Sequence, residues 1–224
     1  MKLGVLFSGG KDSYLALQYA SEDHEISCLL TLESKKEDSW MFHTPAIEWT
    51  RLQAESMKIE HLVQDTSGLK EEELSDLRAI IELAKSEYSI EGIVTGALAS
   101  VYQSTRIQII CNDLGLWCFN PLWQMPQHAL LQDLLSNNIE SIITGIAAEP
   151  FDASWLGRSI NSVCVEDLIQ LEKSNHINPA GEGGEIESFV INAPLFTKGI
   201  EISQSKKHYS NYSGRLEIIE AVLR

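Results

Sequence analysis

Apolar positions in the first half of the chain follow two alternating periods. Short apolar runs bounded by turn residues indicate buried strands, and longer segments with apolar residues three and four positions apart indicate helices packed on a core. The predicted strands are 2–7, 26–32, 61–64 and 92–95, and the predicted helices are 13–20, 45–57, 70–88 and 101–114. This alternation predicts a parallel sheet with helices on both faces and ligands at the carboxyl ends of its strands.

The alternation becomes less regular after Pro121. We expect helices at 126–135 and 163–172, a strand at 141–147, a glycine-rich turn leading into a strand at Ile186, and strands rather than a helix in the tail 200–223. No internal repeat or low-complexity linker separates the two halves. The pattern predicts an α/β domain over residues 1–122, packed against a smaller α+β domain over 123–224.

The stretch SGGKDS, residues 8–13, joins the first predicted strand to the first predicted helix. The first N–H groups of a helix have no partner and the helix dipole adds positive charge, so such a junction favours an anion, above all a phosphate. Two glycines allow close backbone approach, two serines supply hydroxyl donors and a lysine balances charge. These residues are Ser8, Gly9, Gly10, Lys11 and Ser13.

Asp12, within the same stretch, either orients the turn or holds Mg²⁺, and the sequence does not choose between these roles. A Walker P-loop needs GxxxxGK[ST], which this shorter stretch does not provide. The alternative is a plain glycine turn before a helix, with Lys11 and Asp12 exposed to solvent.

Composition and charge narrow the class of protein. The formal net charge of −15 disfavours an extended nucleic-acid surface, which needs clustered Lys and Arg. No apolar run of membrane-spanning length and no signal-peptide pattern occur, so we expect a cytoplasmic protein. The acidic residues 71–73 are expected in the exposed first turn of a helix. The four cysteines show no CxxC pairing and are expected in the core rather than at zinc.

The SGGKDS stretch resembles the PP-loop of ATP pyrophosphatases, which cleave ATP between its α and β phosphates. Five further stretches are similar to the diphthine–ammonia ligase family: MFHTP (41–45), TGALAS (95–100), YQSTR (102–106), WLGR (155–158) and GEGGEIESFV (181–190). The last is the most specific, because tRNA thiolases and other SGGKDS enzymes do not share it. The resemblance implies a HUP-type (adenine nucleotide alpha hydrolase-like) fold for the first domain.

The resemblance also implies a reaction. ATP activates the carboxylate of diphthine, a modified histidine on translation elongation factor 2, and ammonium supplies the nitrogen of the amide while AMP and pyrophosphate are released. The implied cofactors are ATP and Mg²⁺. We expect free ammonium, or ammonia from a partner, because the chain has no room for a glutaminase domain. The sequence leaves open whether the chain forms a homodimer.

Site residues follow from the motifs that match the family. Catalytic roles are expected for Lys11, Asp12 and Arg106, with Asp12 also the Mg²⁺ ligand. ATP contacts are expected from Ser8, Gly9, Gly10, Lys11, Asp12, Ser13, His43 and Gly96. Acceptor contacts are expected from Tyr102, Gln103, Trp155, Arg158, Glu182, Gly184, Glu185 and Glu187.

Several of these residues have a second interpretation. The glutamates of the 181–190 stretch either face the trimethylammonium group of diphthine, with Trp155 or Trp123 as an aromatic wall, or cap neighbouring backbone. Arg106 and Arg158 either clamp an anion through a bidentate fork or form structural ion pairs. The tryptophans expected only to pack are Trp40, Trp49 and Trp117.

Three positions depart from the family pattern. Ala46 stands where Asn is common, Val101 where an acidic residue is common, and Asn192 where Asp is usual. These changes leave the ATP-cleaving turn intact, but they leave open which acceptor the protein uses. The alternatives are therefore an enzyme of the same fold acting on another small carboxylate or nucleotide, or a sensor that binds adenine nucleotide without turnover. A tRNA thiolase is disfavoured by the acidic balance and the missing cysteine pair.

Overall fold

A five-stranded parallel sheet forms the first layer of the protein. The structure is a computed structural model that describes residues 1–34, 46–67 and 70–224. The sheet order is β3-β2-β1-β4-β5, with every neighbouring pair parallel. Its strands are β1 (Lys2–Leu6), β2 (Glu25–Ser34), β3 (Glu60–Thr66), β4 (Gly92–Val94) and β5 (Trp117–Phe119). The predicted parallel sheet is confirmed, although the sequence pattern missed the three-residue β5.

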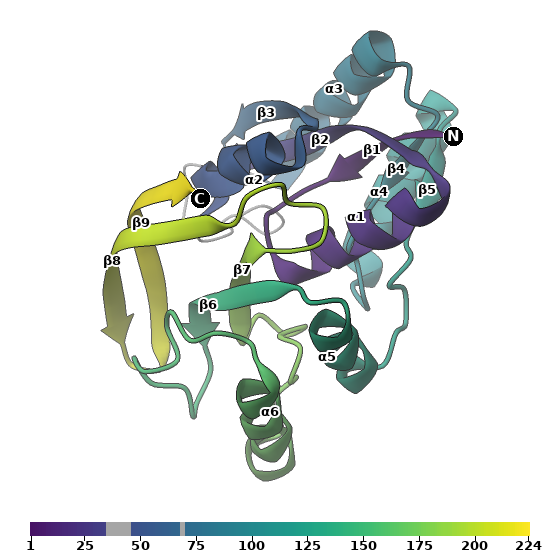
Figure 1. Ribbon diagram of the computed structural model, residues 1–224. Helices are drawn as coiled ribbons and strands as arrows, with labels where there is room; N and C mark the ends of the chain where they lie inside the picture. The colour runs from purple at the N-terminus through teal and green to yellow at the C-terminus, as the bar shows by residue number, and fades with distance from the viewer. Residues whose placement is uncertain (35–45, 68–69) are drawn as a thin grey trace.

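Helices cover both faces of this sheet, as predicted. They are α1 (Lys11–Asp23), α2 (Thr50–Met57), α3 (Lys70–Tyr88) and α4 (Val101–Leu114). Buried residues of α3 and α4 pack with β2 and β4 in one apolar cluster, whereas α1 and α2 belong to a second cluster on the opposite face. Figure 1 shows α1 and α2 between the parallel sheet and the C-terminal part of the chain.

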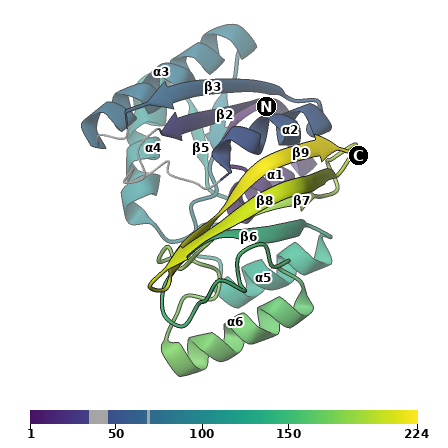
Figure 2. The same ribbon diagram turned by 90° about the vertical axis from the view of Figure 1, so that its left-hand side faces the viewer.

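The C-terminal part is an antiparallel sheet with two helices. Its order is β7-β6-β9-β8, and its pairs are antiparallel. Its elements are α5 (Gln127–Ser136), β6 (Glu140–Ala147), α6 (Ser162–Asn175), β7 (Ile186–Asn192), β8 (Ile200–Ser210) and β9 (Ser213–Leu223). In Figure 2, α5 and α6 lie side by side beneath β6, and β8 and β9 form a long hairpin. The preference for strands in the tail is confirmed.

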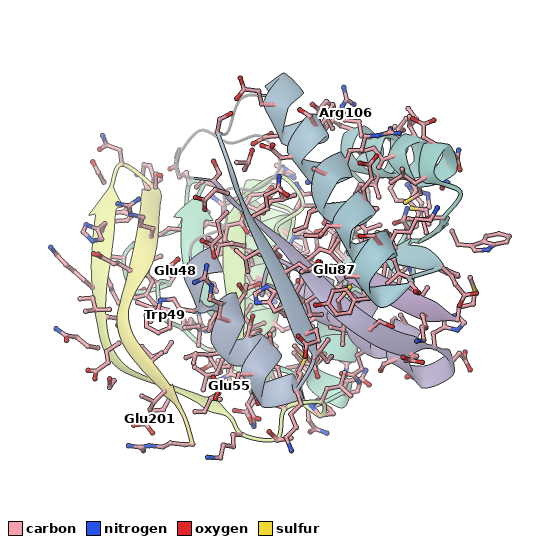
Figure 3. The ribbon with its side chains drawn as sticks, turned by 90° about the horizontal axis from the view of Figure 1, so that it is seen from above. Glu48, Trp49, Glu55, Glu87, Arg106 and Glu201 are labelled. Carbon is pink, nitrogen blue, oxygen red and sulfur yellow. The ribbon has the colours of Figure 1, made fainter. Side chains whose placement is uncertain are left out.

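The two parts share one core instead of meeting at a thin interface. One apolar cluster takes buried residues from α1, α2, α5, β6, β7 and β9. Polar contacts join the same parts: the Leu195 N–H donates to the Tyr14 hydroxyl oxygen (3.0 Å), and Trp49 Nε1 donates to the Ile218 carbonyl (3.2 Å). Figure 3 shows Trp49 between α2 and the β8–β9 hairpin. The domain boundary at 122/123 stays a prediction.

Two helix starts differ from the sequence prediction. Helix α1 begins at Lys11, two residues before the predicted start, so half of the SGGKDS stretch is helical. The second helix does not begin at 45, because Ala46 adopts a left-handed conformation (φ 70°). A 3₁₀ turn, η1 (Ile47–Trp49), follows it and leads into α2. Residue 45 itself, the predicted first residue of that helix, lies outside the described residues.

Two burial predictions were wrong. Glu73 is fully buried although an exposed acidic turn was expected, because it stands four residues before Leu77 on the inner face of α3. Trp117 is 67% exposed rather than packed, because β5 is the edge strand of its sheet. The prediction that the cysteines lie in the core is confirmed for Cys28, Cys111 and Cys164, which are buried. Cys118 is half-buried, and all four cysteines are free. None of the described helices is long and apolar enough to cross a membrane.

Candidate active site

A cavity of ≈ 430 Å³ lies at the carboxyl ends of the parallel strands, where the topology predicts a ligand. One part of its lining is apolar and includes Leu30, Leu32, Ile47, Leu98 and Ile107. The polar part includes Ser8, Gly10, Lys11, Asp12, Ser13, Thr95, Gly96, Ser100, Gln103, Glu182, Gly184, Glu187 and Ser188. The lining therefore brings together ten of the site residues expected from the sequence.

The SGGKDS turn, residues 8–13, is held in shape by tight packing and by its own hydrogen bonds. Gly9 has a φ of +77°, and a Cβ there would lie 2.5 Å from Gln53 Oε1, so only glycine fits. Ser13 Oγ accepts a hydrogen bond from the Ser8 N–H (3.3 Å) and donates to the Gly10 carbonyl (3.0 Å). The backbone amides that start α1 are thereby fixed at the polar end of the cavity.

Lys11 is the first residue of α1 and is only 3% exposed. Its Nζ lies 2.8 Å from Asp12 Oδ2, and its backbone N–H donates to Ser188 Oγ (3.1 Å). The alternative of a solvent-exposed lysine on a plain glycine turn is therefore wrong. The other carboxylate oxygen of Asp12, Oδ1, is buried and has no hydrogen-bond partner among the described residues.

Strand β7 lies directly against this turn. The Val190 N–H donates to the Gly9 carbonyl (3.0 Å), and the side-chain amide of Gln53 donates to the carbonyls of both Gly9 (2.9 Å) and Val190 (2.7 Å). Gln53 and Ser188 were not among the site residues expected from the sequence. Ser188 falls inside the 181–190 motif, whereas the only signal for Gln53 is an amide on the apolar face of a predicted helix.

The acidic loop, residues 181–187, separates into residues that face the cavity and one that shapes the loop. Glu185 accepts hydrogen bonds from the backbone N–H of Asn178 (3.0 Å), from the amide side chain of Asn178 (2.6 Å) and from the N–H of Gly183 (2.8 Å). Glu182 accepts from the Ala99 N–H (3.2 Å) and lines the cavity together with Glu187. Of the two interpretations of these glutamates, capping of neighbouring backbone therefore applies to Glu185, which does not line the cavity.

The pKa values of the three glutamates follow from these surroundings. Burial raises the pKa of Glu187 to about 7; Asp12 reinforces the rise and Lys11 opposes it. Burial, followed by the charge of Asp12, also raises the pKa of Glu182. Burial alone would raise the pKa of Glu185, but its hydrogen bonds from Asn178 and the loop backbone outweigh burial and lower it.

The turn after β4 forms another side of the cavity. A Cβ on Gly96 would lie 2.8 Å from the backbone of Asp12 and Ser13, so this turn touches the start of α1. Ser100 caps α4 by accepting from the Gln103 N–H (3.3 Å), and both residues line the cavity. Gln103, expected to contact the acceptor, therefore lies in the cavity wall directly after this turn, and its role stays a prediction.

Tyr102 and Arg106 lie on α4 but are not part of the cavity lining. The Arg106 guanidinium carbon stands 3.4 Å from the centre of the Tyr102 ring, and its Nη1 donates to the Tyr102 carbonyl (3.3 Å). The two residues therefore stabilise each other in this conformation. Their expected catalytic and acceptor-binding roles stay predictions.

Trp155 and Arg158 form a separate cluster in the C-terminal part. Arg158 makes an ion pair with Asp167 and lies 4.5 Å from the centre of the Trp155 ring, which packs against Phe151. The structural ion pair considered for Arg158 is thus present, and neither residue lines the cavity. His43 lies outside the described residues.

No group of three His, Cys, Asp or Glu side chains in the described part of the chain is arranged to hold a metal ion. Mg²⁺ in nucleotide sites commonly takes only one or two carboxylates and completes its shell with phosphate and water. The buried, unpartnered Oδ1 of Asp12 at the polar end of the cavity fits such a site.

Comparison with known proteins places these features in one family. Residues 1–118 match the family model described as the diphthamide synthase N-terminal domain, and residues 127–223 match the diphthamide synthase C-terminal domain. The chain is 33% identical to the diphthine–ammonia ligase of Rattus norvegicus and 32% identical to that of Homo sapiens, each match covering 92% of this chain and 84% of the relative. A crystal structure from Methanocaldococcus jannaschii, described as a "predicted subunit of tRNA methyltransferase", matches with 19% identity and a TM-score of 0.46 over 86% of this chain and 97% of its own. The chain belongs to the diphthamide synthase family.

Proposed function

We propose that the protein is an ATP-dependent, amide-forming ligase. In the proposed reaction it converts the diphthine carboxylate of elongation factor 2 to diphthamide, using ammonium and releasing AMP and pyrophosphate. The names of its relatives, all diphthine–ammonia ligases, support this acceptor and this nitrogen source. A cytoplasmic location follows as part of the same proposal.

The observation that carries the proposal is the buried Lys11 at the start of α1, at the polar end of a cavity whose other part is apolar. A nucleotide has the same division, because its base is flat and largely apolar and its phosphates are charged. The volume of ≈ 430 Å³ is within the range of small-molecule sites, about 300–1,000 Å³.

The described residues then have separable tasks. The amides of the SGGKDS turn and the Lys11 ammonium bind the outer phosphates and stabilise the charge that develops on the departing pyrophosphate. Asp12 Oδ1 would hold Mg²⁺, which when bound neutralises phosphate charge. Leu30, Leu32 and Ile107 provide apolar surface for the base.

The test is a product assay with purified protein, ATP, Mg²⁺, ammonium and elongation factor 2 carrying diphthine. We expect AMP and pyrophosphate to form only when the acceptor is present, and mass spectrometry to find the acceptor converted to its amide. Lys11→Met should lower kcat about 10²–10³-fold, the usual loss for one preorganised donor. Lys173→Met, on the exposed side of α6, serves as the matched control.

Other products would contradict the proposal in distinct ways. Formation of ADP excludes cleavage between the α and β phosphates. AMP formation with a free small carboxylate, but not with diphthine, would identify a different acceptor. Tight ATP binding without product under all conditions would indicate a nucleotide sensor.

A further inference from the structure

The described lining of the cavity contains more carboxylates than cationic groups. Lys11 is its one ammonium group, and it shares the described lining with the carboxylates of Asp12, Glu182 and Glu187. Bound Mg²⁺ beside Asp12 would offset charge near the phosphates. Glu182 comes from the acidic loop and Glu187 from β7 instead, and a second cation beside them would favour the charged form of both carboxylates.

Both glutamates retain hydrogen-bonding capacity inside the cavity. The Glu187 side chain is desolvated, lines the cavity and accepts no hydrogen bond from any described residue. Glu182 accepts one, from the Ala99 N–H. Both carboxylates also feel the same two charges, those of Lys11 and Asp12, so they face one region of the cavity. A largely enclosed carboxylate without a donor from the protein is well placed to accept hydrogen bonds from a ligand that brings N–H groups.

We propose that Glu182 and Glu187 form the binding site for the ammonium ion that supplies the amide nitrogen, which becomes a nucleophile once one proton has left it. This inference rests on the proposed amide-forming function and assigns one of its substrates to named residues. Ammonium brings one positive charge and four N–H donors, and carboxylates are strong charge-assisted acceptors for them.

The lining distinguishes ammonium from the trimethylammonium group of diphthine. A quaternary ammonium ion has no N–H donor and is commonly held by aromatic faces. Phe7 is the one aromatic residue in the described lining, so the described residues do not surround a cation with several aromatic faces. Trp155 lies in the separate cluster with Arg158. Among the described residues the lining thus offers hydrogen-bond acceptors but no aromatic wall, which suits ammonium.

The experiment measures the KM for ammonium with Glu182→Gln and Glu187→Gln, at saturating ATP and diphthine-bearing acceptor. Glutamine keeps the size of the side chain and removes its charge. We expect the KM for ammonium to rise at least about tenfold in each variant. The KM for ATP and the exchange of labelled pyrophosphate into ATP without ammonium should stay within about twofold, since adenylation does not use the nitrogen. Glu220→Gln on the exposed hairpin is the matched control.

A second experiment replaces ammonium with a neutral nucleophile. Hydroxylamine is uncharged at the pH of the assay, so the glutamine variants should use it nearly as well as the unmodified protein does. A variant that cannot fold would lose the pyrophosphate exchange as well, which separates misfolding from loss of the ammonium site.

Three results would overturn the inference. A raised KM for the acceptor with an unchanged KM for ammonium would assign the glutamates to diphthine. Lost pyrophosphate exchange that is restored by excess Mg²⁺ would make them metal ligands. Unchanged kinetics would leave them without a role in substrate binding. Failure of the proposed function itself would appear in the unmodified protein, as absence of acceptor-dependent AMP.

Discussion

Replacing Gly96 with alanine tests whether the proposed ATP cavity depends on close contact between the β4–α4 turn and the start of α1. The added Cβ would lie 2.8 Å from the Asp12 carbonyl carbon and from the Ser13 nitrogen. These are backbone atoms, so no side-chain rotation relieves the overlap. The start of α1 is itself held by the bond from the Lys11 N–H to Ser188, so the turn must move away.

The expected cost follows from the overlap. Ordinary contacts of a Cβ lie at 3.4–4 Å, so the turn must shift by more than half an ångström. Overpacking of this kind typically costs about 1–3 kcal/mol. In a protein of 224 residues, each kcal/mol lowers Tm by about 2–4 °C. Because the displaced turn lines the cavity, we also expect ATP affinity to fall about tenfold, equivalent to about 1.4 kcal/mol.

Thermal unfolding and calorimetric titration with Mg²⁺ and ATP measure the two effects separately. Gly115→Ala is the matched control: Gly115 has a φ of +64° at the end of α4, and its added Cβ would meet nothing within 4 Å. Left-handed strain should cost this variant about 1–2 kcal/mol without changing ATP affinity. The reasoning is refuted if Gly96→Ala binds ATP like the unmodified protein, or if both variants weaken binding equally.

Three further changes test other parts of the site. Gln53→Met removes two donors to buried carbonyls and should lower the free energy of unfolding in urea by about 1–3 kcal/mol; an unchanged midpoint would contradict this. Asp12→Asn should raise the Mg²⁺ concentration for half-maximal AMP formation about tenfold, whereas a changed KM for ammonium alone would exclude a metal role. Between pH 4.5 and about 7 the unfolded Glu187 carboxyl ionises while the folded one stays protonated, so stability falls as pH rises. In Glu187→Gln the free energy of unfolding, measured from unfolding curves at several pH values, should therefore fall less as pH rises. If the variant and the unmodified protein show the same pH dependence, the raised pKa belongs to another group.

Local sequence signals predicted the elements of the fold and the turn at the centre of the site. Apolar periodicity is a property of neighbouring residues, and it predicted β1, α4 and even the strands of the tail correctly. Local signals failed where burial depends on the final packing. Glu73 carries a charge that patterns assign to the surface, and Trp117 is an aromatic residue on a strand that ends the sheet.

The contacts that shape the site could not be predicted from local sequence patterns, because they join residues far apart in the chain. The Lys11 N–H meets Ser188 across 177 positions, and Gln53 meets Val190 across 137. No sequence period links such residues. The separation of Glu185 from Glu182 and Glu187 likewise depends on how the loop folds back on Asn178, although all three lie in one motif.

Strand β7 holds the SGGKDS turn and the acidic loop together at the cavity. It is the edge strand of the antiparallel sheet, and an edge presents unpaired backbone groups. Here the SGGKDS turn pairs with that edge, because the Val190 N–H bonds to Gly9 and Ser188 accepts from Lys11.

These two bonds set the register of β7 against the turn and therefore where Glu187 lies. A slip of one residue would bring an isoleucine or a serine to that place and move the carboxylate away from Lys11. The fixed interval between the acidic residues and Ser188 in the motif GEGGEIES thus has a physical cause. A site built this way requires both parts of the chain, since Lys11 and Asp12 come from the turn whereas Glu182 and Glu187 come from the C-terminal part.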